Sequence, residues 1–308
     1  MTSRVIVFGS INLDLVAGVE KISSPGETVS GHSFETFPGG KGANQAMAAH
    51  RADGEVTLFG KVGDDAAGRQ LLEFYQSNDL STDNILTTTA HPTGTALIQV
   101  EQDSGENSIV VVPGANAEFT NAEIDSIDIA AGDVLVSQFE VPQSAIERLF
   151  RRARACGAKT ILNPAPASDM HFTLLDVVDV LVVNETELSF FAGQSLSDSS
   201  SNDDIAAIAR ELTVSNQQVI LVTLGKRGCL AVVGDQIISV PGRDVKAIDA
   251  TGAGDCFVGS LGMKLSQGSA LEEALNFANV AASISVQREG AGPSMPLAEE
   301  ILSILEDV

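Results

Sequence analysis

The sequence DVLVSQFEVPQSAIERLFRRARACGAKTILNP, residues 133–164, places a helical pattern between two short apolar runs. Residues 143–156 return an apolar side chain every three or four positions, which predicts an amphipathic helix. The flanking runs 133–138 and 159–164 are rich in Val, Ile and Leu and predict buried strands. Strand, helix and strand in succession form a right-handed crossover, so this stretch predicts two parallel strands of one sheet.

The same alternation continues on both sides of this unit. Further strands are predicted at 4–10, 55–60, 179–184 and 218–225, and further helices at 42–51, 65–78, 203–214, about 254–266, 269–286 and 297–306. This order predicts an α/β fold with a doubly wound, mostly parallel sheet flanked by helices. Because no linker-like segment separates the elements, we expect residues 1–308 to form a single domain.

Two segments, 15–37 and 93–112, interrupt the alternation. In the second segment, DSGEN at 103–107 separates two strand-like runs and predicts a hairpin turn. We expect the two segments to form a small separate sheet that covers one edge of the large sheet as a lid. Such a sheet exposes one apolar face, which a substrate or a second subunit can cover.

The charge of the chain limits its partners. A formal net charge of −23 argues against binding to nucleic acid or to an anionic membrane. The acidity is either that of a solvated surface or an adaptation to high salt. The three cysteines show no paired spacing, and no stretch resembles a signal peptide or a membrane span, so we expect a cytoplasmic protein.

The stretch DATGAGDCFVG, residues 249–259, combines a turn of small residues with the start of an apolar helix. The chain lacks both the P-loop and the dinucleotide-binding fingerprints. The amides of Gly252, Ala253 and Gly254 carry no bulky side chain, and amides at a helix N-terminus bind anions such as phosphate. Asp255 is a candidate base for a hydroxyl that attacks phosphorus; a simple helix N-cap is the alternative.

Polar residues also follow the first predicted strand. Asn12 and Asp14 in GSINLD lie on one side of an extended segment, at the carboxyl end of a strand, where ligands of α/β sheets gather. They offer the donors and acceptors that a polyhydroxyl ligand needs, although an ordinary turn explains them equally well. A second candidate segment, which allows backbone contact with a ligand or is only a strained loop start, contains Gly39, Gly40, Lys41 and Asn44.

Eleven motifs follow one another along nearly the whole chain. They are GSINLD (9–14), PGET (25–28), GGKGANQA (39–46), GDD (63–65), GANA (114–117), QFEVP (138–142), NPAPA (163–167), NETE (184–187), TLGKRG (223–228), DATGAGDCF (249–257) and GAGPSMP (290–296). In these motifs and their order the chain resembles the ribokinase-like carbohydrate kinases. The resemblance implies a nine- or ten-stranded doubly wound sheet with a β-sheet lid. It also implies transfer of the γ-phosphoryl group of ATP to the primary hydroxyl of ribose.

The resemblance implies roles for individual residues. Asp255 matches the catalytic base of the family, and the amides of residues 252–254 match its anion hole. The sugar-contacting positions of the family correspond to Asn12, Asp14, Gly40, Lys41, Asn44 and Glu140. Asn184 and Glu187 match a motif that organises Mg²⁺ and phosphates through water, whereas the residues alone predict a helix cap; both roles can coexist.

Nucleotide and cation positions follow from the same resemblance. The nucleotide-contacting positions correspond to Thr223, Leu224, Gly225, Lys226, Arg227, Gly228 and Asn279. A pair of loops that binds K⁺ in the family, largely through carbonyl oxygens, corresponds to Asp249, Thr251, Ser285, Arg288, Gly290 and Ser294. The implied cofactors are ATP, Mg²⁺ and K⁺, and the implied assembly is a homodimer formed through the lid sheet.

Two residues depart from the family pattern or add to it. Ala250 stands where a threonine is common, which we expect to matter little because Thr251 is the better match to the cation-linked position. Cys256 directly follows the candidate base. A position near a helix N-terminus favours a lowered thiol pKa and inhibition by oxidation, and a small buried residue is the alternative interpretation.

The residues leave other functions open. They include a kinase of 2-deoxyribose, fructose or a nucleoside on the same fold, and a sugar-binding protein without catalysis, which the intact Asp255 disfavours. The missing glycine fingerprint disfavours an NAD-dependent dehydrogenase. The four histidines show no metal-ligand spacing, and we expect them to be structural or surface residues.

Overall fold

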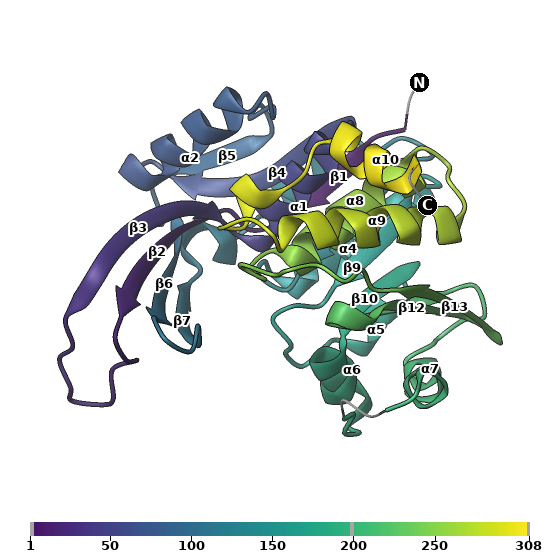
Figure 1. Ribbon diagram of the computed structural model, residues 1–308. Coiled ribbons are helices and arrows are strands. Elements are labelled where there is room, and N and C mark those ends of the chain that lie inside the picture. Colours follow the sequence, from purple (N-terminus) through teal and green to yellow (C-terminus); the bar gives the residue numbers. More distant parts are fainter. Residues whose placement is uncertain (1–2, 198–199, 307–308) are drawn as a thin grey trace.

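A computed structural model describes residues 3–197 and 200–306 of the chain (Figure 1). Residues 1–2, 198–199 and 307–308 of the expected domain lie outside the described part. The described residues form one large and one small β-sheet, together with helices on both faces of the large sheet. None of the described helices has the length and apolar character needed to span a membrane.

The large sheet has nine strands in the order β13-β12-β11-β10-β9-β8-β1-β4-β5. From β5 to β11 every neighbouring pair is parallel, and β12 and β13 extend the sheet as antiparallel strands. The prediction of a mostly parallel, doubly wound sheet is confirmed. The strands are β1 (Val5–Phe8), β4 (Val56–Gly63), β5 (Ile85–Thr88), β8 (Val134–Gln138), β9 (Lys159–Asn163), β10 (Val180–Asn184), β11 (Val219–Thr223), β12 (Gly228–Val233) and β13 (Gln236–Pro241).

Helices cover the two faces of the large sheet and create two separate cores. Because successive side chains of a strand point to opposite faces, Val5 and Val7 of β1 enter one core, and Ile6 and Phe8 enter the other. The first core contains side chains from α1 (Lys41–Arg51), α2 (Ala66–Ser77), α8 (Ala253–Ser266), α9 (Leu271–Ser285) and α10 (Ala298–Glu306). The second contains side chains from α3 (Asn121–Asp125), α4 (Gln143–Ala155), α5 (Phe172–Leu175), α6 (Glu185–Ala192) and α7 (Asn202–Glu211).

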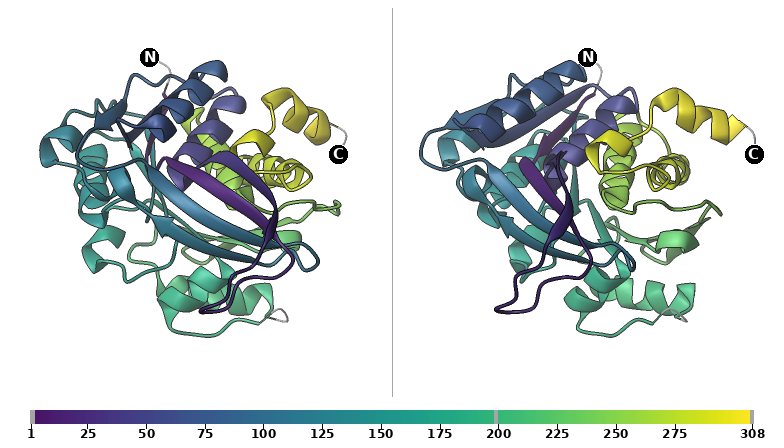
Figure 2. Two further views of the ribbon diagram at one scale, coloured as in Figure 1. Left: turned by 90° about the vertical axis from the view of Figure 1, so that its left-hand side faces the viewer. Right: turned by 60° about the vertical axis from the view of Figure 1, so that its left-hand side comes forward.

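The small sheet has the strand order β3-β2-β6-β7 and projects from the body of the molecule (Figures 1 and 2). Its strands are β2 (Asn12–Val19), β3 (Gly31–Gly39), β6 (Gly94–Glu101) and β7 (Asn107–Val112). The two segments predicted to form a separate sheet do so, and the sheet starts earlier than 15, at Asn12. Asn12 pairs with Gly39 and Gly94, so Asn12 and Asp14 lie in a strand rather than in the turn that was the alternative.

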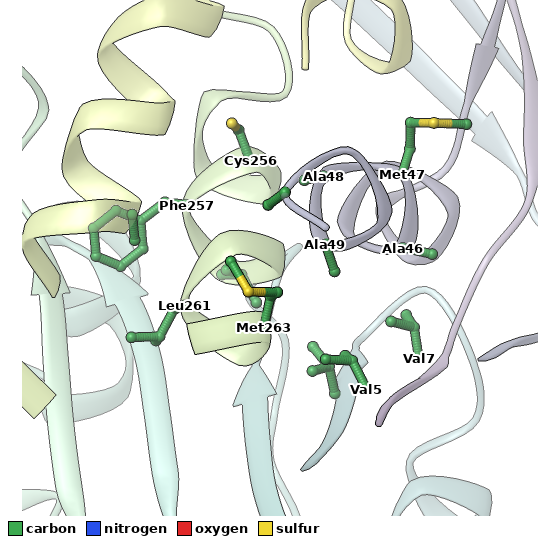
Figure 3. Close-up of a cluster of buried hydrophobic side chains, with 14 of the residues drawn as sticks. Val5, Val7, Ala46, Met47, Ala48, Ala49, Cys256, Phe257, Leu261 and Met263 are labelled. Carbon is green, nitrogen blue, oxygen red and sulfur yellow. The ribbon is translucent and has the colours of Figure 1, made fainter. Parts of the chain in front are cut away.

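Helices α1 and α8 pack closely against each other on the first core (Figure 3). Ala48 and Ala49 of α1 lie beside α8, which contributes Cys256, Phe257, Leu261 and Met263 to the cluster. The approach is closest at Gly259, where an added Cβ would lie 2.2 Å from the carbonyl oxygen of Gln45. A residue without a side chain is therefore required at this point of the interface.

We expect Gly259→Ala to reduce the free energy of unfolding by about 1–3 kcal/mol, because its methyl group must push the α1 backbone away. Gly262→Ala is the matched control in the same helix. An added Cβ there would meet only side chains, the nearest being Val136 at 3.2 Å, and alanine is the better helix former. Denaturant unfolding measures both variants, and equal stability would contradict the close approach.

Candidate active site

Polar residues gather at the carboxyl ends of the parallel strands. The chain leaves β1 toward β4 on one side and builds β8 to β11 on the other, so the topological switch point lies between β1 and β8. Ligands of open α/β sheets bind at this place. The residues that end strands here or directly follow them include Ser10 after β1, Glu140 after β8, Asn163 on β9, Asn184 on β10 and Thr223 on β11.

Asp255 is buried at the start of α8, where two side-chain amides of α1 hold its carboxylate. Asn44 Nδ2 donates to Asp255 Oδ2 at 3.1 Å, and Gln45 Nε2 donates to Asp255 Oδ1 at 3.0 Å. The N-cap of α8 is Gly252, and Asp255 lies in the first turn, so the interpretation of Asp255 as the cap is wrong. Its carboxylate is fixed by the neighbouring helix rather than by its own backbone.

The turn before Asp255 presents unpaired amides. Gly252 adopts a φ of 75°, a left-handed conformation that favours glycine. Ala253 N donates to Ala250 O at 3.2 Å, whereas the amides of Gly252, Gly254 and Asp255 have no hydrogen-bond partner among the described residues. A Cβ added at Gly254 would meet no atom within 4 Å, so the packing of the chain does not demand a glycine there. The open space and the free amides together suit an anion.

Two neighbouring cavities flank this turn. One of about 220 Å³ is lined by Lys41, Asn184, Glu187 and Asp255 among other residues. The other, of about 310 Å³, is lined by the predicted nucleotide residues Gly225, Lys226, Gly228 and Asn279. Thr223, Ala250 and Gly254 line both cavities, so the two cavities lie side by side.

The side chains of two predicted nucleotide residues make contacts with the rest of the protein. Leu224 is buried in the second core. The Arg227 guanidinium pairs with Glu185 Oε1 at 2.5 Å and also donates to Ser200 O, and its side chain does not line the larger cavity. These contacts give both residues a structural role.

Asn184 and Glu187 form the predicted helix cap at the start of α6. Glu187 N donates to Asn184 Oδ1 at 2.8 Å, and Asn184 N donates to Glu187 Oε2 at 2.9 Å. Burial raises the pKa of Glu187, against opposing contributions from the Asn184 amide and from Lys41. Both residues also line the smaller cavity, so capping leaves them available to a ligand.

A third cavity, of about 500 Å³, opens beside the base of the small sheet and is lined by Asn12 and Glu140 among other residues. Asn12 Oδ1 accepts a hydrogen bond from Asn116 Nδ2 at 2.8 Å. Glu140 Oε2 accepts from Ser10 Oγ at 2.5 Å and from Lys41 N at 3.1 Å. Glu140 therefore ties β1 to the start of α1.

Several acidic side chains lie close to one another and to Lys41 in this part of the structure. Burial raises the pKa of Asp14 to about 7, and the nearby carboxylates of Glu140 and Asp255 contribute in the same direction. The carboxylate of Asp255, followed by those of Glu140 and Glu187, holds the pKa of Lys41 above its ordinary value despite burial. Lys41 is therefore a permanent cation between the carboxylates. Asp14 also lies against Gly39, where an added Cβ would be 2.1 Å from its Oδ2.

The two loops predicted to bind a cation lie together. Asp249 Oδ1 accepts from Thr251 N at 2.8 Å, and its Oδ2 accepts from Gly290 N at 2.9 Å. Ser285 and Ser294 are buried and donate their hydroxyls to the carbonyls of Ala282 and Ala291. The Arg288 guanidinium instead pairs with Glu300.

Cys256 contradicts the expectation of a reactive thiol. Its side chain on α8 is fully buried and contacts Ser285 of α9, and burial raises its pKa to about 12. A thiol that stays protonated and inaccessible to solvent reacts slowly with oxidants. The interpretation as a small buried residue is confirmed.

The prediction from sequence missed several buried polar residues around the site. Ser10, Gln45, Asn116, Gln138 and Asn163 make side-chain hydrogen bonds that reach Glu140, Asp255 or Asn12 directly or through one another. All five lie within the motifs quoted above, and that placement was the available signal. Their roles depend on which strand ends meet, which spacing alone does not specify.

Comparisons with known proteins agree with this fold. The pfkB family carbohydrate kinase pattern matches residues 2–298. The ribokinase of Haemophilus influenzae is 35% identical over 308 residues, which cover 99% of both chains. The structure of Arabidopsis thaliana ribokinase complexed with ribose and ATP has a TM-score of 0.88 at 30% identity and covers 99% of both chains.

Two further relatives bear on specificity and length. The deoxyribokinase of Salmonella typhi is 32% identical over 299 residues, which cover 96% of both chains. A bifunctional ribokinase/ribose-5-phosphate isomerase A of Fructilactobacillus sanfranciscensis is 35% identical over 306 residues. The match covers 98% of this chain and 56% of that protein.

The raised pKa of Asp14 predicts a pH-dependent stability. The folded protein binds the Asp14 proton more tightly than the unfolded chain, whose aspartate pKa is 3.8, so this group destabilises the fold increasingly from about pH 4 to about pH 7. We expect Asp14→Asn to stabilise the fold at pH 8 by about 1–3 kcal/mol and to have little effect near pH 4. Thermal unfolding at both pH values measures the effect.

Asp65→Asn is the control, because we expect the pH dependence of its effect on stability to have the opposite sign. Hydrogen bonds from Thr93 and Gly68 lower the pKa of Asp65 in spite of its partial burial. Its contribution is therefore present above the unfolded pKa and is lost as the pH falls. An Asp14→Asn effect that does not vary with pH would contradict the raised pKa.

Proposed function

The chain belongs to the pfkB family of carbohydrate kinases, and on this basis we propose that it uses ATP to phosphorylate the 5-hydroxyl of D-ribose, giving ribose 5-phosphate. The observation that carries the proposal is the position of Asp255. Its carboxylate is fixed by two amides of α1, next to free amides at Gly252 and Gly254. It lines a cavity whose neighbour is lined by predicted nucleotide residues.

The chemistry follows from these groups. The Asp255 carboxylate takes the proton of the sugar hydroxyl as that oxygen forms a bond to the γ-phosphorus of ATP. The bond between the γ-phosphorus and the β,γ-bridging oxygen breaks, and ADP leaves with the electron pair. The free amides at the start of α8 and the cationic Lys41 stabilise negative charge on the transferring group. Asn12, Asp14, Asn44 and Glu140 would hold the sugar.

Cations have a clear role in so acidic a site. The part of the chain that the structure describes has no group of three or more His, Cys, Asp or Glu side chains that could hold a metal ion. A Mg²⁺ ion would arrive with the ATP phosphates, and Asn184 and Glu187 would act on its water ligands. A K⁺ ion held by the paired loops around Asp249 and Gly290 would add positive potential beside the anion-binding turn.

The second candidate is a kinase of 2-deoxyribose, favoured by the similarity to a deoxyribokinase. A site that hydrogen-bonds the 2-hydroxyl leaves buried polar groups unpaired when the deoxy sugar binds, so kcat/KM should fall strongly. Asp14 and Asn12 are buried or half-buried polar groups of this kind.

We also expect a cytoplasmic location, which the three free cysteines support.

A coupled assay of ADP release over ribose, deoxyribose, fructose and nucleosides tests the substrate. We expect the highest kcat/KM for ribose and a lower kcat when Na⁺ replaces K⁺. Equal kcat/KM for ribose and deoxyribose would overturn the ribose preference. Ribose binding without any ADP release would instead favour a sugar-binding protein that lacks catalysis.

We expect Asp255→Asn to lower kcat by about 10²–10⁴, because the variant loses its general base. Affinities for sugar and nucleotide should stay within a few fold of the wild type, since the amide has nearly the same shape. Steady-state kinetics and calorimetric titration measure the two quantities. A nearly unchanged kcat would exclude Asp255 as the base.

We further propose that the chain forms a homodimer through its small sheet, which acts as the lid of a single kinase domain. Directly paired residues point to the same face of a sheet, so Leu97, paired with Leu15 and Val110, lies on the face opposite to Asn12 and Asp14. Phe34 is paired with Ala17 and shares that face. Leu97, Val110 and Phe34 are 48%, 57% and 67% exposed, a surface that a second subunit would cover.

We expect the wild type to sediment as a dimer and Leu97→Glu and Val110→Glu to sediment as monomers, because each would bury a carboxylate in the interface. Leu302→Glu is the matched control, since Leu302 is a 45% exposed leucine on α10, outside the small sheet. Sedimentation velocity at micromolar concentration measures the state. A monomeric wild type, or charged variants that remain dimeric, would exclude this interface.

A further inference from the structure

We propose that Gln45 and Gln138 form a positioning relay of two side-chain amides that sets the orientation of the Asp255 carboxylate. The inference deepens the proposed function, on which it rests, since it concerns the base of that reaction. The relay carries no proton, because neither amide titrates. Its role is to hold one carboxylate oxygen in a single position.

The relay connects three elements through buried groups. Gln45 of α1 and Gln138 of β8 are both fully buried. Gln138 Nε2 donates to Gln45 Oε1 at 2.5 Å, and Gln45 Nε2 donates to Asp255 Oδ1 at 3.0 Å. The order of donors and acceptors therefore runs from the end of the central sheet, through α1, to the carboxylate on α8.

The side-chain amide of Asn163 determines the orientation of the Gln45 amide. Gln45 Nε2 also donates to Asn163 Oδ1 at 3.3 Å, and Asn163 Nδ2 donates to the backbone carbonyl of Val182 at 3.0 Å. Turning the Gln45 amide over would place its oxygen against the Asp255 carboxylate and Asn163 Oδ1. The turned amide would also place Gln45 Nε2 against Gln138 Nε2, so that two donors would face each other. Only one orientation of Gln45 satisfies all three neighbours.

The orientation of the Gln138 amide leaves one of its polar atoms unpaired. Its Oε1 is buried and has no hydrogen-bond partner among the described residues. Turning the Gln138 amide over would set two amide oxygens against each other at Gln45, so the unpaired oxygen is the lesser penalty. The space for that oxygen exists because residue 9 is glycine, where an added Cβ would lie 2.1 Å from it. If Gln138 served only to fill space, an apolar side chain would do so without leaving a buried oxygen unpaired.

The test uses Gln138→Met and Gln45→Met, which keep a similar shape and remove the amide. In the full-length protein with its best sugar and ATP, we expect each to lower kcat about 10–100-fold with KM values within about threefold, as for a displaced reacting group. The double variant should lose little more than Gln45→Met alone, because the two amides act through one contact. Additive losses in kcat, or unchanged kcat in Gln138→Met, would overturn the relay.

Gln218→Met is the matched control. Gln218 is also a buried glutamine, and its Nε2 donates to the carbonyls of Leu175 and Val178, away from Asp255. We expect it to lower the melting temperature more than Gln138→Met does and to leave kcat unchanged. A loss of kcat in Gln218→Met equal to that in Gln138→Met would assign the effect to general destabilisation and overturn the relay.

A crystal structure of Gln138→Met tests the relay without turnover. We expect the Gln45 amide and the Asp255 carboxylate to be rotated relative to the wild type. An unmoved carboxylate would overturn the inference even if kcat falls. A wild type that phosphorylates none of the sugars overturns the proposed function instead, and the crystallographic comparison still decides the relay.

Discussion

The close packing of α1 against α8 is the contact on which the site depends. Gly259 lets α8 approach the backbone of α1 at Gln45, and this approach brings Asn44 and Gln45 within hydrogen-bond distance of Asp255. One interface therefore serves both the core and the chemistry. A small increase in the helix separation would lengthen both hydrogen bonds to the carboxylate, and positioning errors of about 1 Å are enough to impair catalysis strongly.

Electrostatics explains how so acidic a protein can accept an anionic substrate. The net charge of −23 is a property of the whole chain, whereas the field at the proposed phosphate site comes from nearby groups. Free amides at the start of α8 and the cationic Lys41 supply local positive potential. They stand against Asp14, Glu140, Glu187 and Asp255, and this balance is the physical reason to expect bound cations at the site.

Because side chains alternate along its strands, the small sheet presents polar residues on one face and apolar residues on the other. Asn12 and Asp14 share the face that begins at the end of β1, while Leu15, Leu97 and Val110 share the opposite face. A single strand, β2, therefore carries residues of the proposed sugar site on one side and part of an apolar surface on the other. Covering the apolar surface would limit the freedom of the sheet and so of Asp14.

The sequence by itself determined the alternation of strands and helices, the separate small sheet and the position of Asp255 beside a turn of bare amides, because periodicity and local backbone chemistry are short-range properties. Only the tertiary structure decided that Gly252 rather than Asp255 caps α8, that Cys256 is buried, that the Leu224 side chain lies in the second core and that Arg227 pairs with Glu185. It also decided that Gln45 makes hydrogen bonds with Asp255, Gln138 and Asn163. These outcomes depend on burial and on which strand ends become neighbours, and residues far apart in the chain acquire both only when the sheet has formed.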